Sequence, residues 1–120
     1  MLKRRLNRAE PPPETCPLTL CMRYLNGAWT ANILWYLSSG PRRFTELKQD
    51  LLGVSAKVLT QRLRRMERDG LVQRHVVSSS PPSVEYSLDE LGNELVPVLK
   101  ALVQVGHKIK VRHVPRMRAA

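Results

Sequence analysis

The sequence predicts a small, mainly α-helical domain with a short pair of β-strands in its second half. The chain has 120 residues, about the length of one domain. Apolar residues recur at helical spacing through most of it, whereas residues 71–77 and 83–88 have the composition of strands. Because 42% of the residues are apolar and 5% are aromatic, we expect a mainly aliphatic core.

Proline and charge distinguish the ends of the chain from its middle. The Pro11-Pro12-Pro13 run can neither continue a helix nor pair in a sheet, so residues 1–14 are expected to form a flexible basic arm. Residues 15–110 form the predicted domain, and residues 111–120 form a basic tail. The net charge is +10. Much of it lies in the two end segments, so the total charge alone does not indicate which surface would meet an acidic partner.

Three short helices are expected in the first half of the domain. The first covers about residues 18–25 and ends at Asn26-Gly27. The second covers about residues 29–37 and is followed by a glycine and a proline, which commonly end helices. The third is short and begins at Thr45, whose hydroxyl could cap it.

A fourth helix, residues 56–69, is predicted to have two unlike sides. Ser55 can cap its first turn by accepting a backbone N–H bond. At about 100° per residue, Leu59, Leu63 and Met66 fall on one stripe. The opposite stripe is basic and hydrogen-bonding, and it consists of Lys57, Gln61, Arg64 and Arg68.

Two strands and a long helix complete the domain. The strands are joined by a serine- and proline-rich loop, residues 78–82, which is too long for a two-residue hairpin turn and is expected to project. The last helix is expected to start near Asp89, and its apolar residues recur with alternating spacings of four and three. That spacing is typical of a helix that pairs with another helix. The residues of this row are Leu91, Leu95, Val98, Leu102, Val105 and Ile109.

This order of elements is that of a winged helix-turn-helix domain, in which one helix enters the major groove of DNA. The basic stripe of residues 56–69 would then face the duplex, since lysine and arginine can bind guanine and glutamine can pair with adenine. A charged stripe is also typical of a helix side that meets only solvent. The cap at Ser55, the short helix before it and the strands after it favour DNA contact.

Twelve residues are therefore candidates for DNA contact. Four near the start of the predicted recognition helix are candidates for reading bases, namely Ser55, Lys57, Thr60 and Gln61. The others are candidates mainly for phosphate contact, namely Arg43, Thr45, Arg64, Arg65, Arg68, Arg74, Ser79 and Ser80.

Six short motifs occur together at a characteristic order and spacing. Cys16-Pro17 opens the domain, and Gly27-Ala28-Trp29-Thr30 opens the second helix. The remaining four cover residues 40–47, 54–63, 69–72 and 82–92. Over about residues 15–107, the set resembles the HxlR family of bacterial transcriptional regulators, which are relatives of the MarR group.

The resemblance implies a homodimer in which the first and last helices make the subunit contact and the helix after Ser55 enters the major groove. Some members of the family sense oxidants or electrophiles with the cysteine of the Cys-Pro motif. The wing departs from the family pattern, because its tip has three serines and no basic residue.

The dimer contact is predicted to combine two residues of the first helix with the apolar row of the last. The alternative is that the row is buried against the chain's own core, but its length, widened by Leu99 and Val103, favours a partner helix. A dimer would present two recognition helices roughly 34 Å apart, which predicts an inverted-repeat operator. The candidate contact residues are Leu18, Met22, Leu91, Leu95, Val98, Leu102, Val105 and Ile109.

Cys16 is the candidate redox sensor. It stands beside Pro17 at a helix start, where the helix dipole can stabilise a thiolate. The alternative is an inert buried thiol, and Cys21 lies on a different face of the helix, poorly placed to form a disulfide with Cys16. No metal site and no cofactor are expected, because no Cys or His pair supplies further ligands at a recognisable spacing.

The predicted function is sequence-specific binding of double-stranded DNA by a transcriptional regulator, a repressor rather than an activator, with a small-molecule or electrophilic effector as a further candidate partner. An enzyme is not expected, since the sequence has no nucleophile–base pair or phosphate-binding glycine loop. Two alternatives remain open. One is a basic RNA-binding or ribosome-associated protein, which would need exposed aromatic residues on a sheet. The other is a winged-helix module that binds only protein, which would not need the basic stripe.

The sequence does not predict membrane association. No apolar run approaches the roughly 18–20 residues that cross a bilayer. The basic opening residues 1–5 are not followed by an apolar stretch, as they would be in a secretory signal. We therefore expect a cytoplasmic protein of the bacterial nucleoid.

Overall fold

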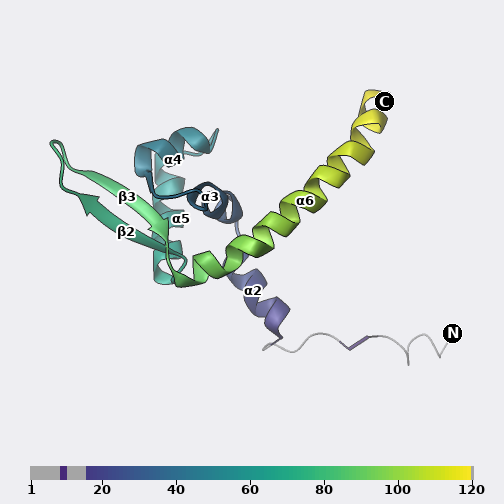
Figure 1. Cartoon of the computed structure of the whole chain (residues 1–120), viewed down its shortest axis with the longest axis horizontal. Coiled ribbons are helices and arrows are strands. Elements are labelled where there is room, and N and C mark those ends of the chain that lie inside the picture. The colour runs from purple at the N-terminus through teal and green to yellow at the C-terminus, as the bar shows by residue number, and fades with distance from the viewer. Residues whose placement is uncertain (1–8, 11–15, 120) are drawn as a thin grey trace.

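The computed structural model describes residues 9–10 and 16–119 of the chain, with side chains as far as Arg112 (Figure 1). Most of the predicted arm, residues 1–14, lies outside the described residues. The elements, in chain order, are α2 (Pro17–Leu25), α3 (Thr30–Leu37), β1 (Arg42–Arg43), α4 (Phe44–Asp50), α5 (Ala56–Arg68), β2 (Val72–Val77), β3 (Ser83–Leu88) and α6 (Glu90–Ala119). The predicted fold class, mainly helical with a small β wing, is confirmed.

The core lies where α3, α4 and α5 meet the root of α6 and one face of the sheet. Ile33, Leu34, Leu47, Leu59 and Leu63 are completely buried. The core is aliphatic as predicted, because Tyr86 of β3 is the one aromatic residue among the buried residues of the described chain. Burying each of these leucine-sized side chains contributes roughly 1.5–3 kcal/mol, so the three helices are fixed against one another.

Backbone geometry sets the starts of α3 and α4. The second helix begins one residue later than predicted, because Trp29 takes a left-handed conformation with φ of 76° and α3 starts at Thr30. The predicted cap at Thr45 is wrong. Helix α4 begins at Phe44, and its cap position is Arg43, whose backbone N–H donates to the Glu46 carboxylate at 2.8 Å. An acidic side chain in the third helical position can satisfy this donor, and the helix therefore starts earlier in the chain than predicted.

A third strand, which the sequence did not predict, joins the two expected ones. The strand order is β1-β3-β2, with both pairs antiparallel. In this register Tyr86 of β3 lies between Arg42 of β1 and Arg74 of β2. β1 has two residues, too few to show an alternating pattern. The loop between β2 and β3 extends away from the helices, as expected for a wing (Figure 1).

Helix α6 is buried only near its start. The Asp89 carboxylate accepts hydrogen bonds from the Gln73 side chain at 3.0 Å and from the Glu90 backbone N–H at 2.8 Å, and both bonds lower the pKa of Asp89. Leu95 and Leu99 are buried, whereas the helix beyond them extends out of the body of the molecule (Figure 1). It continues to Ala119, so residues 111–119, which we predicted as a tail, are helical.

None of the helices in the described residues is long and apolar enough to cross a membrane.

Two glycines of α6 provide a test of how its root is packed. A Cβ on Gly92 would overlap the backbone carbonyl oxygen of Leu71, whereas a Cβ on Gly106 would meet nothing within 4 Å. We expect Gly92→Ala to lower the free energy of unfolding by about 1–3 kcal/mol, because the backbone of Leu71 must move. We expect Gly106→Ala to raise it by roughly 0.5–1 kcal/mol, because alanine restricts the unfolded chain.

Urea unfolding of both variants, followed by circular dichroism, measures the difference. Both substitutions add the same methyl group to the same helix, so each serves as the control for the other. Equal effects from the two would contradict the close approach of α6 to the Leu71 carbonyl.

Candidate nucleic-acid interface

Helix α5 has one apolar and one basic side, as predicted. Leu59 and Leu63 are completely buried, and Met66 is 1% exposed. The side chains of the opposite stripe are all exposed, namely Lys57, Gln61, Arg64 and Arg68. Burial of the first set fixes the rotation of the helix, and that rotation turns the second set toward solvent.

Three of the candidate side chains on or next to α5 already have partners within the chain. The Ser55 hydroxyl accepts from the Val58 backbone N–H at 3.1 Å, and the Thr60 hydroxyl donates to the Ala56 carbonyl at 2.8 Å. The Nε of Arg65 lies 3.8 Å from an Asp69 carboxylate oxygen. These contacts stabilise the helix and reduce what the three side chains can offer a ligand.

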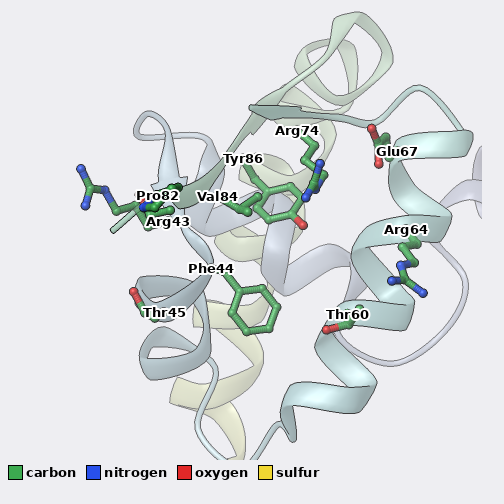
Figure 2. A pocket seen from close by; sticks show the side chains of 11 residues that line it. Arg43, Phe44, Thr45, Thr60, Arg64, Glu67, Arg74, Pro82, Val84 and Tyr86 are labelled. Carbon is green, nitrogen blue, oxygen red and sulfur yellow. The ribbon is translucent and has the colours of Figure 1, made fainter. Parts of the chain in front are cut away.

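A cavity of about 570 Å³ opens between α5, the start of α4 and the sheet (Figure 2). Five of the candidate DNA-contact residues line it, namely Arg43, Thr45, Thr60, Arg64 and Arg74. Figure 2 shows the rings of Phe44 and Tyr86 between the strands and α5, with Glu67 and Arg64 on the helix side. With three arginines and one glutamate, its charged lining suits an anionic ligand such as a phosphate backbone.

Sequence reasoning missed Phe44, Glu67 and Tyr86 as parts of this surface. Tyr86 could have been found only from strand register, which places it directly opposite Arg74. Phe44 lies beside it because β1 pairs with β3 and leads straight into α4.

The wing contributes polar groups and no positive charge at its tip. Ser79 and Ser80 are exposed, and the Ser79 hydroxyl donates to the Pro81 carbonyl at 2.7 Å. The basic residue on the wing is Arg74, near its base. The remaining wing contact to DNA would therefore be made by hydroxyl and backbone groups.

The candidate dimer residues divide into two groups. Leu91 and Leu95 pack in the chain's own core, and Leu95 is 4% exposed. The prediction that Leu95 meets a partner is therefore wrong, because the first two turns of α6 cover the core. The other six are exposed, namely Leu18, Met22, Val98, Leu102, Val105 and Ile109.

The exposed apolar row of α6 continues onto α3. Trp35 and Tyr36 of α3 are partly exposed, and with Leu102 and Val103 they line a second cavity of about 290 Å³. Their rings add apolar area beside the row, at a place where a single copy of the chain leaves it uncovered.

Cys16 occupies the cap position before α2, and its thiol is only partly exposed. The backbone N–H groups of Thr19 and then Leu18, at the open start of α2, lower the pKa of the thiol without forming a cap hydrogen bond to it, and desolvation opposes them. Both Cys16 and Cys21 are free thiols. The described residues contain no group of three or more His, Cys, Asp or Glu side chains that could hold a metal ion.

The model of the HxlR-like helix-turn-helix family matches residues 24–114. The chain belongs to the HxlR family. Its HxlR relatives include YdeP of Bacillus subtilis, an HTH-type transcriptional regulator that is 36% identical over 107 residues, which are 89% of this chain and 83% of YdeP. This HxlR protein is accordingly a transcriptional regulator with a DNA-binding winged helix-turn-helix domain.

Solved structures of other regulators are similar to it, and they include the following two. A MarR-family transcriptional regulator from Porphyromonas gingivalis W83 has a TM-score of 0.78 and 30% identity, over 82% of this HxlR chain and 97% of the other. The redox regulator HypR in its oxidized form has a TM-score of 0.72 and 32% identity, over 78% of this chain and 96% of HypR.

The lowered pKa of Cys16 predicts rapid alkylation. Because the Thr19 and Leu18 N–H groups stabilise its thiolate, Cys16 in a Cys21→Ser variant is expected to react with iodoacetamide faster than glutathione does at neutral pH. Its rate should also reach half of its maximum at a lower pH than that of glutathione. Mass spectrometry of the quenched protein measures both. A variant with Cys16→Ser is the control for Cys21, and a Cys16 profile that matches glutathione would contradict the stabilised thiolate.

Proposed function

We propose that the protein is a repressor that binds an inverted-repeat DNA operator as a homodimer, with α5 of each subunit in the major groove. The observation that carries this proposal is the exposed basic stripe of α5 opposite its buried apolar stripe. An α-helix fits the major groove, where each base pair presents a distinct pattern of donors and acceptors.

Lys57 and Gln61 are the main candidates for reading bases. Both are exposed in the first half of α5, whereas the hydroxyls of Ser55 and Thr60 are occupied with backbone groups of the same helix. The phosphate contacts are assigned to the residues around this centre, namely Arg43, Thr45, Arg64, Arg65, Arg68, Arg74, Ser79 and Ser80.

The exposed row of α6 supports the homodimer. Leu102, Val105 and Ile109 are each at least half exposed on a helix that extends beyond the domain body. A contiguous apolar surface of this kind marks a protein interface. The partner proposed here is a second copy of the chain, which would place two α5 helices on one side of a duplex, roughly one turn of DNA apart.

Cys16 is the proposed switch. Its thiol has a lowered pKa and stands at the start of α2, where Leu18 and Met22 are exposed. The similarity to the redox regulator HypR supports a role in sensing oxidants or electrophiles. The sheet favours DNA over RNA, since its described strands contain a single Phe, Tyr or Trp side chain, Tyr86, which is 7% exposed and offers little stacking surface.

Two substitutions on α5 separate base reading from phosphate contact. Gln61→Ala is expected to relax the preference at one base position of each half-site, with a loss of about 1–3 kcal/mol on the preferred duplex and little on random duplex. Arg68→Ala is expected to weaken both duplexes alike and to reduce the salt dependence of binding by about one ion.

Fluorescence anisotropy at several salt concentrations, with a duplex selected from a random pool by the wild-type protein, measures these effects. Equal losses on selected and random duplex for Gln61→Ala would remove it from base reading. Tighter binding of single-stranded RNA than of any duplex would overturn the proposed function.

A charge placed in the exposed row of α6 tests the homodimer. Ile109→Glu is expected to convert a dimer to a folded monomer, because Ile109 is half exposed in the single chain and a buried carboxylate would be costly between subunits. Val76→Glu, at a similarly exposed valine on β2, is the matched control and should leave the dimer intact. Analytical ultracentrifugation at micromolar concentration distinguishes the two, and a monomeric wild type would contradict the dimer.

A further inference from the structure

Arg62 leaves α5 on a different side from the basic stripe. At about 100° per residue it lies roughly 60° from Leu59, on the flank of the apolar side, and roughly 100° from Gln61. Its guanidinium group lies against Gly27, in the turn that connects α2 to α3. A Cβ on Gly27 would lie 2.6 Å from Nη1, 3.1 Å from Cζ and 3.2 Å from Nη2 of Arg62.

Both Gly27 and Arg62 are constrained at this contact. Gly27 has φ of +98°, a conformation that residues with a side chain rarely adopt, and it leaves no room for a side chain beneath the guanidinium. The Nε of Arg62 is buried and has no hydrogen-bond partner. An unsatisfied buried donor is unfavourable, so the contact of the guanidinium group with the glycine, and not a hydrogen bond from Nε, must hold the side chain in this position.

The contact ties α5 to a helix that is otherwise weakly held. None of the residues of α2 is buried, and its C-terminal residue is Leu25, two residues before Gly27. A helix C-terminus carries partial negative charge, so a guanidinium group placed just beyond it is favourable. Arg62, the residue after the exposed Gln61, therefore contacts the α2–α3 turn and does not face solvent with the basic stripe.

We propose that Arg62 is a positioning residue that fixes the orientation of α5 on the α2–α3 turn and does not itself contact DNA. The inference rests on the proposed function in one respect, namely that α5 is the helix that reads DNA. Because α2 carries Cys16 at its start and exposes Leu18 and Met22, the same side chain links the proposed switch and subunit contact to the DNA-reading helix.

A double-mutant cycle tests the contact without DNA. Gly27→Ala is expected to lower Tm by roughly 4–8 °C more than Gly53→Ala. For a domain of this size, that shift corresponds to about 1 kcal/mol of unfolding free energy, which is lost to the clash with Arg62. Gly53 is the matched control, since its φ is +90° and a Cβ there meets nothing within 4 Å. In an Arg62→Ala background, the two glycine substitutions should lower Tm equally, because only the shared backbone strain remains.

DNA binding provides the second measurement. Arg62→Lys keeps the charge but lacks the guanidinium group that lies against Gly27, so it should weaken binding to the selected duplex about tenfold. Random duplex should be bound as before, the salt dependence should not change, and the preferred base sequence should stay the same. Arg68→Ala, in contrast, should weaken both duplexes and reduce the salt dependence.

The two measurements distinguish failure of the proposed function from failure of the positioning role. A wild-type protein that selects no duplex overturns the proposed function, while the Tm cycle still decides whether Arg62 is seated on Gly27. Additive losses of Tm in the cycle overturn the contact. Wild-type affinity of Arg62→Lys for the selected duplex overturns the positioning role. So does a fall in the salt dependence by about one ion in Arg62→Ala, because it would place Arg62 on a phosphate.

Discussion

Burial of one stripe of α5 is the constraint on which the rest of the molecule depends. Leu59, Leu63 and Met66 are almost wholly inside the core, and rotating the helix by even one residue would expose at least one of them at a cost of roughly 1.5–3 kcal/mol. The exposed polar side of α5 is therefore as fixed as its apolar side. A DNA-binding surface built in this way loses little conformational freedom when it meets a duplex, apart from that of the side chains themselves.

Helix α6 serves the interior and the exterior of the domain in succession. Its first turns close the core with Leu95 and Leu99, and the Asp89 backbone N–H donates to the Leu71 carbonyl at 2.9 Å. Farther along, the same spacing of apolar residues continues where the described chain leaves them about half exposed. The periodicity is continuous, but the environment changes from the chain's own core to solvent or a partner.

The sequence could predict features that lie within one element, but not contacts between segments that are distant in the chain. The two sides of α5 follow from helical periodicity, because both the buried and the exposed residues lie within one element. The assignment of Leu95 to a subunit contact was wrong because a repeating apolar row does not indicate which protein surface covers it. β1 and the cavity beside Tyr86 depend on strand register between distant segments. Helical periodicity sets Arg62 apart from the basic stripe, but it does not reveal the contact with Gly27, which lies 35 residues earlier.

The hydrogen bond from the Asp89 N–H to the Leu71 carbonyl attaches the start of α6 to the segment that connects α5 to β2. A 30-residue helix is about 45 Å long. Tilting it by about 5° would displace its far end by about 4 Å, given that length. In a symmetric pair joined along such helices, a small change of angle at this junction would become a change in the separation of the two reading helices. Because duplex DNA has a fixed helical repeat, the distance between the two α5 helices would then decide whether the dimer can bind.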